Sequence, residues 1–212
     1  MNDTASSRWL GPAQLTALGF LALILTGTVL LTMPFSSADG TATAPMSALF
    51  TATSATTLTG LVTEDTGSHW SLAGQVIVLA LIQVGGLGIM SITSLTGMLL
   101  TGRVKLRSRY STAAEGRPIL EGGVRRTLVA TLLLTFFFEA VVAAILFIRF
   151  ATTYDMPLPR AAWEGVFHAI SAFNNAGFGL RSDSLISYNT DGWILIPLAG
   201  ALMIGGLGYP VL

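Results

Sequence analysis

The sequence contains two copies of one pattern, and this repeat restricts the fold to an architecture built from two similar units. Residues 50–61 read FTATSATTLTGL and residues 167–178 read FHAISAFNNAGF, with the same residue at five positions, glycine near the end included. The motif GGLG follows each copy, at residues 85–88 and again at 205–208. Two motifs repeated in the same order indicate an internal duplication. Each copy holds an apolar segment, a polar turn ending in glycine and a further apolar segment.

The composition indicates the environment in which these units fold. Hydrophobic residues make up 52% of the 212 residues and charged residues only 10%, whereas soluble domains carry about 25% charged residues. Segments 9–38, 66–102 and 192–212 contain no Asp, Glu, Lys or Arg. A helix of about 20 apolar residues crosses a bilayer. The sequence therefore predicts an integral membrane protein.

We predict an all-α membrane protein of tandem helix–re-entrant loop–helix repeats. The first repeat covers residues 1–102, a basic cytoplasmic loop covers 103–126, and the second repeat covers 127–212 with an incomplete inner helix. Long helices are expected at 15–33, 70–100 and 127–148 and beyond residue 191, the last with a kink at Pro197. Short helices are expected at 45–55 and 161–172.

We predict the short helix at 45–55 because it lies in an uncharged stretch that is too polar to face lipid. Residues 40–63 include eight threonines, and a lipid-facing helix has no use for so many hydroxyls. Pro45 fits the first turn of a helix, where its missing N–H does no harm. Such a helix measures about 16 Å, half of the ~30 Å hydrocarbon layer. The chain must therefore return as non-helical backbone, which survives at that depth only when it is buried in protein or lines water.

The charge distribution predicts the topology. Residues 102–127 hold seven Lys and Arg against two Glu, a net charge of 7 − 2 = +5. Basic loops remain in the cytoplasm during membrane insertion, so this loop and the amino terminus are expected inside and both turns open outward. A nucleic-acid patch is the alternative reading of the basic run. We reject it because membrane helices flank the run, which leaves the bilayer as the expected partner.

Several single residues allow a functional and a structural interpretation. Glu139 near the middle of a helix is expected to face other protein; a functional role is the default for such a group, but we favour a hydrogen bond to the neighbouring turn. His168 is expected to be packed, because two histidines do not make a metal site. The GGLG motif fits close helix packing or gating equally well. Trp70 is expected to anchor the helix at the membrane interface.

The polar turns suit the passage of a dehydrated cation. A ring of backbone carbonyl oxygens can replace the water shell of the ion. Carbonyls that point one way need unusual dihedral angles, which glycine adopts without strain. A short helix that precedes the turn directs its partially negative end at the ion. The chain has no Walker sequence, nucleophile elbow, HExxH or paired cysteines, and we expect no enzymatic activity.

FTATSATTLTGL, the IQVGGLGIM segment and FHAISAFNNAGF resemble the Trk/Ktr/HKT potassium transporters, and within them the bacterial Ktr membrane subunit. The resemblance extends over nearly the whole chain, from about residue 10 to 212. It implies that backbone carbonyls of two four-residue turns coordinate the ion: Thr57, Leu58, Thr59 and Gly60 in the first repeat, and Asn174, Asn175, Ala176 and Gly177 in the second. Gly60 is the filter glycine of the first repeat. It implies a preference for potassium, because family members with serine in place of this glycine favour sodium.

The same resemblance implies a pseudo-fourfold pore of four repeats in the cell membrane. This chain would be the amino-terminal half, a fragment whose partners are the remaining two repeats. It also implies a homodimer on a cytoplasmic ring of nucleotide-binding regulatory subunits, with potassium as substrate and no cofactor in this chain. Two alternatives remain: a secondary carrier with re-entrant hairpins, and a non-conducting half. Both repeats run in the same orientation, which counts against a carrier.

Overall fold

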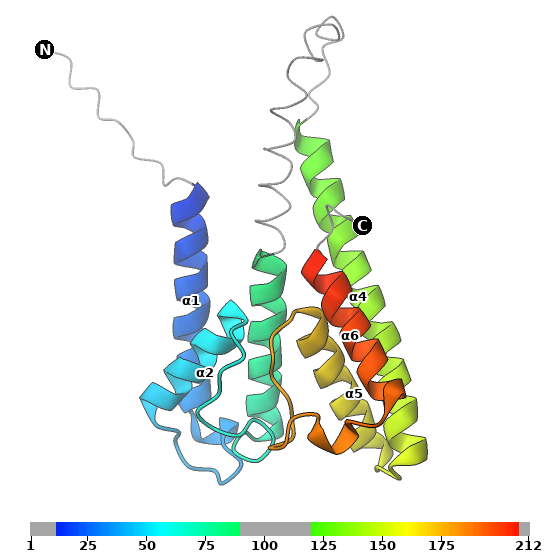
Figure 1. Cartoon of the computed structure of the whole chain (residues 1–212). Coiled ribbons are helices and arrows are strands. Elements are labelled where there is room, and N and C mark those ends of the chain that lie inside the picture. Colours follow the sequence, from blue (N-terminus) through cyan, green and yellow to red (C-terminus); the bar gives the residue numbers. More distant parts are fainter. Residues whose placement is uncertain (1–11, 90–119, 208–212) are drawn as a thin grey trace, which may run out of the picture.

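The computed structural model describes residues 12–89 and 120–207, which form helices joined by loops (Figure 1). Within these residues the β-structure is limited to one isolated antiparallel bridge, between Ser37 and Trp70. The predicted all-helical architecture is therefore confirmed for the described part. The expected helix end near residue 100 and the basic run at 103–119 lie outside it.

The first unit contains a long helix, a short helix and a second long helix. Helix α1 spans Pro12–Thr32, and the single 3-10 turn η1 (Pro34–Ser36) follows it. Helix α2 spans Pro45–Thr57, two residues longer than predicted. The next helix covers Leu72–Ile89, and we call it the first inner helix. Proline begins α2 and no proline lies within it, so the helix continues until the chain turns left-handed at Leu58.

The second unit repeats this order. Helix α4 spans Leu120–Thr153, α5 spans Leu158–Phe173, the 3-10 turn η2 spans Ile186–Tyr188 and α6 spans Gly192–Leu207. The predicted bounds of α4 were wrong at both ends. Charged residues suggested a loop there, but they do not break a helix, and the stretch contains no proline.

Among the described residues, three helices are long and apolar enough to cross a membrane: Gln14–Thr32 within α1, the first inner helix and Val129–Thr153 within α4. Helix α6 is apolar but shorter, with 16 residues described. It continues through Pro197 without interruption. Large apolar side chains such as Leu25, Phe137 and Ile196 are exposed, as expected for a surface that faces lipid.

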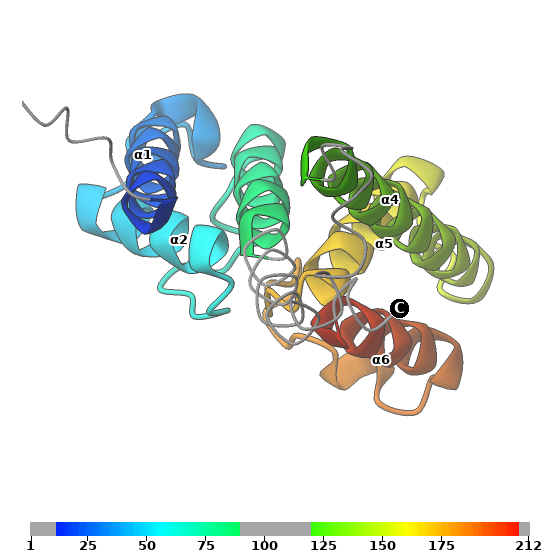
Figure 2. The same ribbon diagram turned by 90° about the horizontal axis from the view of Figure 1, so that it is seen from above.

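The short helices pack against the lower halves of the long ones, α2 on α1 and α5 on α4 (Figure 1). The first inner helix lies between the α1–α2 pair and the second unit (Figure 2). One apolar cluster joins the units: Val78 and Ile82 of the first inner helix pack with Phe167 and Phe178. Trp70 belongs to the same cluster and is 1% exposed, so the expected anchoring role at the membrane surface was wrong.

A second cluster holds α4, α5 and α6 together. It includes Leu146 and Phe150 of α4, Ala169 of α5 and Ile194 of α6. The core therefore surrounds both short helices and fixes the position of the turns at their carboxyl ends.

Candidate functional site: two glycine turns

The short helices end in turns with the same backbone conformation. In residues 57–60, which we call the first turn, Leu58 has φ = 58° and Gly60 has φ = 74°. In residues 174–177, the second turn, Asn175 has φ = 55° and Gly177 has φ = 72°. The positive angles fall on matching positions of the sequence repeat. Left-handed backbone is uncommon for leucine, so the contacts around Leu58 must hold it in place, whereas asparagine adopts it more readily.

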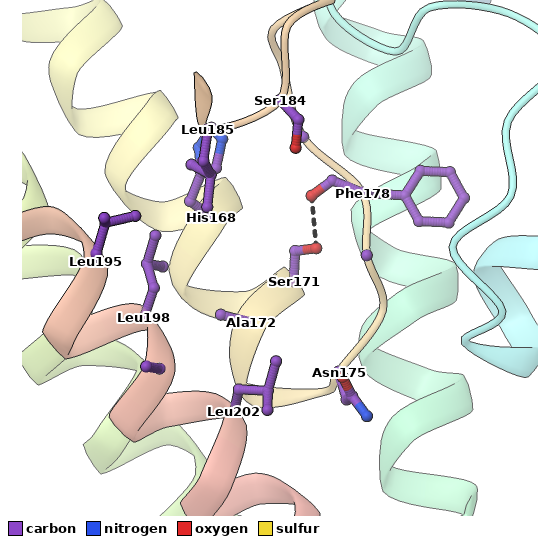
Figure 3. A pocket seen from close by; sticks show the side chains of 13 residues that line it. His168, Ser171, Ala172, Asn175, Phe178, Ser184, Leu185, Leu195, Leu198 and Leu202 are labelled. Atoms are coloured by element: carbon purple, nitrogen blue, oxygen red, sulfur yellow. Dashed lines mark hydrogen bonds between the residues drawn. The ribbon is translucent and has the colours of Figure 1, made fainter. Parts of the chain in front are cut away.

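Matching backbone hydrogen bonds hold the turns. Thr59 N donates to Ser54 O at 3.0 Å, and Ala176 N donates to Ser171 O at 2.8 Å. The side chains differ: the Thr59 hydroxyl donates to Ser54 Oγ at 2.9 Å, whereas Ser171 Oγ donates to Phe178 O at 2.6 Å (Figure 3). One serine thus braces each turn from the last helical turn before it.

The turns meet at their glycines. A Cβ atom added to Gly60 would lie 2.9 Å from Ala176 O and 3.2 Å from Gly177 Cα. A Cβ atom added to Gly177 would lie 3.1 Å from Gly60 Cα. The absence of a side chain is therefore required at both positions, by dihedral angle and by space. Of the eight residues selected from the sequence, the structure brings these three into contact across the units.

Thr57 and Asn174, the first residues of the turns, lie at the helix ends and make different contacts. The Thr57 hydroxyl donates to Thr53 O at 2.8 Å, within its own helix. Asn174 is 2% exposed, and its Nδ2 donates to Glu139 Oε1 at 3.1 Å and to Gln83 Oε1 at 3.2 Å. The expected hydrogen bond between Glu139 and a turn is confirmed.

Gln83 was missed by the sequence reasoning. Its Nε2 donates to Glu139 Oε2 at 3.2 Å, so it connects the first inner helix to α4 and to the second turn. The available signal was the presence of two glutamines, Gln75 and Gln83, in an otherwise apolar helix. Gln75 also reaches the second unit, because its Oε1 accepts from Trp163 Nε1 at 2.7 Å.

The GGLG motifs lie against the ends of the short helices. A Cβ atom on Gly85 would overlap the carbonyl oxygen of Thr56, and one on Gly205 would overlap that of Phe173. Thr56 and Phe173 occupy matching positions of the repeat. The packing interpretation of the motif is therefore confirmed, whereas its role in gating remains a prediction.

His168 is packed, as expected. It is 5% exposed and its Nδ1 lies 2.8 Å from Glu164 O. Among the described residues, no group of three or more His, Cys, Asp or Glu is arranged to hold a metal ion.

Asp191 organises the loop that precedes α6. It accepts hydrogen bonds from Arg149 Nε at 2.7 Å, from the Tyr154 hydroxyl at 3.1 Å and from Trp193 N at 3.0 Å. The Arg149 guanidinium, followed by the smaller effects of these other donors, holds the pKa of Asp191 below its ordinary value. Asp191 therefore caps α6 and ties it to α4.

Asp39 plays a similar part in the loop after α1. Its Oδ1 accepts from Ser37 Oγ at 2.6 Å and from Thr41 N at 3.0 Å. These hydrogen bonds, that from Ser37 first, lower the pKa of Asp39 to about 2. The loop after α1 and the loop before α6 are thus each held by the hydrogen bonds of one carboxylate.

A pocket of about 410 Å³ opens beside the second turn, on the side away from the first unit (Figure 3). Helix α5, the turn and helix α6 form its walls, with Ser171, Asn175 and Gly177 on one side and Leu198 and Leu202 on the other.

Long apolar helices in two similar units, with most charges outside the candidate spans, define an integral membrane protein. Comparison with known proteins then identifies its kind. The model of the TrkH family, described as cation transport protein, matches residues 12–212. The chain belongs to this family.

Similar proteins include Ktr system potassium uptake protein B of Bacillus subtilis, which is 40% identical over 205 residues, or 95% of this chain and 44% of that protein. Potassium/sodium uptake protein NtpJ of Enterococcus hirae is 37% identical over 203 residues. Ktr system potassium uptake protein B of Vibrio alginolyticus is 37% identical over 202 residues. The chain spans less than half the length of these relatives. Their names describe transport rather than catalysis.

Proposed function

We propose that this chain contributes two segments of a selectivity filter through which potassium enters the cell. The observation that carries the proposal is the pair of matching turns, each with positive φ at its second and fourth residues, in contact at Gly60 and Gly177. The proposed ligands are the backbone carbonyls of residues 57–60 and 174–177. Membership of a cation transport family and likeness to proteins named for potassium uptake support this assignment.

The physical argument rests on how a cation loses its water. Right-handed and left-handed backbone conformations that alternate along a turn allow successive carbonyl groups to face one side. Carbonyl oxygens can then replace the hydration shell of potassium. Helices α2 and α5 end at the turns, so their partially negative ends favour a cation there. Glycine at the fourth position of both turns supports potassium as the preferred ion, because no side chain competes for the ligand space.

We further propose that two additional helix–re-entrant loop–helix repeats complete the ring of filter carbonyls, and the pocket beside the second turn supports this. In the first unit, Val78 and Ile82 are buried against Phe178 of the second. Leu198 and Leu202 occupy the matching positions of α6 and line the pocket instead. The surface that one repeat offers to the next is thus covered in the first unit, whereas in the second unit Leu202 is 44% exposed, although Leu198 is only 6% exposed. A third repeat would cover it with an equivalent turn.

The remaining proposals concern the assembly and its orientation. We place the protein in the cell membrane with the amino terminus and the basic segment 103–126 in the cytoplasm, as the charge distribution favours. A homodimer on cytoplasmic nucleotide-binding subunits is proposed from the resemblance alone. Potassium is the substrate in this proposal, and the chain uses no cofactor.

Ion flux in liposomes tests the function. The transporter with all four repeats should take up rubidium, a potassium substitute, when a membrane potential is the only driving force. Uptake that requires a sodium or proton gradient would instead favour the carrier alternative. A lack of uptake under any gradient, with intact protein in the liposomes, would contradict the proposal.

A further inference from the structure

The contacts among Gln83, Glu139 and Asn174 suit one carboxylate and two amides. Asn174 Nδ2 faces both Gln83 Oε1 and Glu139 Oε1, and Gln83 Nε2 faces Glu139 Oε2. Each of these three contacts needs a donor on one side and an acceptor on the other. The carboxylate of Glu139 accepts at both oxygens, and all three contacts are satisfied.

An amide at position 139 cannot satisfy the same set. If its nitrogen faced Gln83, both other amides would have to turn over, and the Asn174 oxygen would then face the second oxygen at position 139. If its nitrogen faced Asn174, two donors would meet directly. One contact is lost in either case.

The orientation of Asn174 is fixed by its surroundings. Nδ2 also donates to Ile170 O at 2.9 Å, so its two protons are shared among three acceptors. Asn174 Oδ1 is buried without a hydrogen-bond partner and lies against Gly86, where an added Cβ atom would overlap it. Turning the amide over would place its oxygen against three acceptors, which is unfavourable in a buried site.

We infer that Gln83 is a positioning residue for the second turn, acting through this cluster rather than by touching the ion. The inference rests on the proposed filter function of residues 174–177. Asn174 is the first residue of that turn, and Gln83 belongs to the preceding unit, so the first inner helix sets the placement of a filter segment in the next repeat. The corresponding residue of the first turn, Thr57, donates only within its own helix in the described structure.

The matching position of α6 carries Met203 rather than glutamine. Within the described residues, the cluster is therefore found at the junction between the first and second units and is not repeated on α6. A change at Gln83 should disturb the second turn and leave the backbone hydrogen bonds of the first turn in place.

Exchange of the two side chains gives a direct test. Gln83→Met removes the two groups that accept from Asn174 and donate to Glu139, and it keeps the length of the side chain. Gln83→Glu combined with Glu139→Gln keeps one carboxylate and two amides in the cluster. The carboxylate accepts from both amides, and Asn174 still donates twice. Rubidium and sodium uptake are measured for each variant in the four-repeat transporter, in cells that lack other potassium uptake systems.

We expect Gln83→Met to raise the sodium-to-rubidium uptake ratio by about tenfold, the effect of losing a charge-assisted hydrogen bond, and the exchange variant to keep the ratio of the parent. Gln75→Met is the matched control, because it makes the same substitution on the same helix at another contact between the units. It should lower protein level at most and leave the ratio unchanged.

A normal ratio for Gln83→Met at normal protein level would overturn the inference. If Gln83→Met fails to accumulate, the exchange variant decides: its failure to fold, or an altered ratio in it, would also overturn the inference. Gly60→Ser is tested in parallel. If it shifts the ratio and Gln83→Met does not, only the positioning role fails; if Gly60→Ser has no effect, the proposed filter itself fails.

Discussion

At the scale of single residues, buried hydrogen bonds decide how the proposed filter turns are held. Ser54 and Ser171 brace the turns locally through equivalent backbone contacts. Glu139 acts from another helix, where a charged group is costly unless it is paired. Both of its partners are amide nitrogens, and each would lose an acceptor if the carboxylate were removed.

Substitutions at Glu139 should separate hydrogen bonding from charge. We expect Glu139→Gln to be mild, because it loses one contact of the cluster, at a net cost of about 1 kcal/mol. Glu139→Leu leaves the amides of Asn174 and Gln83 short of acceptors, at a cost of ~1–3 kcal/mol each. Thermal unfolding in detergent and rubidium uptake measure both effects. Loss of transport in the Gln variant, with folding intact, would show that the charge itself is needed.

Asp191 predicts a pH dependence of stability. Its pKa lies below the ordinary value of 3.8 in the folded protein, so the carboxylate contributes stability that is fully present above about pH 4. This contribution is lost as the pH falls through the folded pKa. Asp191→Asn should therefore lower the melting temperature at pH 6 and have progressively less effect toward pH 3. A melting difference that stays constant over this range would contradict the assignment of the pKa shift.

At the scale of elements, close contact between inner helices and short helices depends on glycine. Gly85 and Gly205 lie where any side chain would overlap a carbonyl oxygen at the end of α2 or α5. Helices that approach so closely cannot accommodate even a methyl group without displacing the end of the short helix and hence the turn.

Alanine substitutions test this packing. Gly85→Ala should destabilise the protein by about 1–3 kcal/mol, the usual cost of overpacking. Gly88→Ala is the control, because its Cβ atom would lie 3.4 Å from Phe20 in ordinary contact, and alanine favours helix by about 1 kcal/mol. Thermal unfolding of both variants gives the comparison. Equal stability of the Gly85 variant and the parent would refute the close contact.

The order of the elements could be predicted from the sequence, whereas their contacts could not. The repeat, the prolines and the threonine-rich stretch placed α2 and α5 correctly to within three residues at either end. Helix α4 was predicted too short because charge was interpreted as loop. Gln83 and the contact of Gly60 with Gly177 depend on how the units pack, and a pattern along one chain does not contain that information.

The burial of Trp70 also could not be predicted from the sequence. Its position at the start of an apolar helix is typical of a side chain at the membrane surface. In the structure the bridge to Ser37 and the apolar cluster bury it instead. Interface and core positions share the same local sequence signal, so only packing distinguishes them.

At the scale of the whole molecule, two turns can form only half of a fourfold ring. We therefore predict that liposomes containing this 212-residue chain alone, shown to be monomeric, do not take up potassium. Incomplete rings leave polar backbone without partners at membrane depth. Potassium flux through the monomeric chain would contradict the proposed four-repeat arrangement.

We propose that Gly60 and Gly177 belong to the ion pathway, and the most direct measurement is paired rubidium and sodium uptake by Gly60→Ser in the proposed four-repeat transporter. A Cβ atom at Gly60 would lie 2.9 Å from Ala176 O at φ = 74°, which costs of order 1 kcal/mol or more and shifts the carbonyls.

Potassium then loses matched ligands, whereas sodium can retain part of its water and use the added hydroxyl. We predict lower rubidium uptake and a higher sodium-to-rubidium ratio for Gly60→Ser, while Gly88→Ser changes protein level without changing the ratio. An unchanged ratio for Gly60→Ser at normal protein level would remove this turn from the ion pathway.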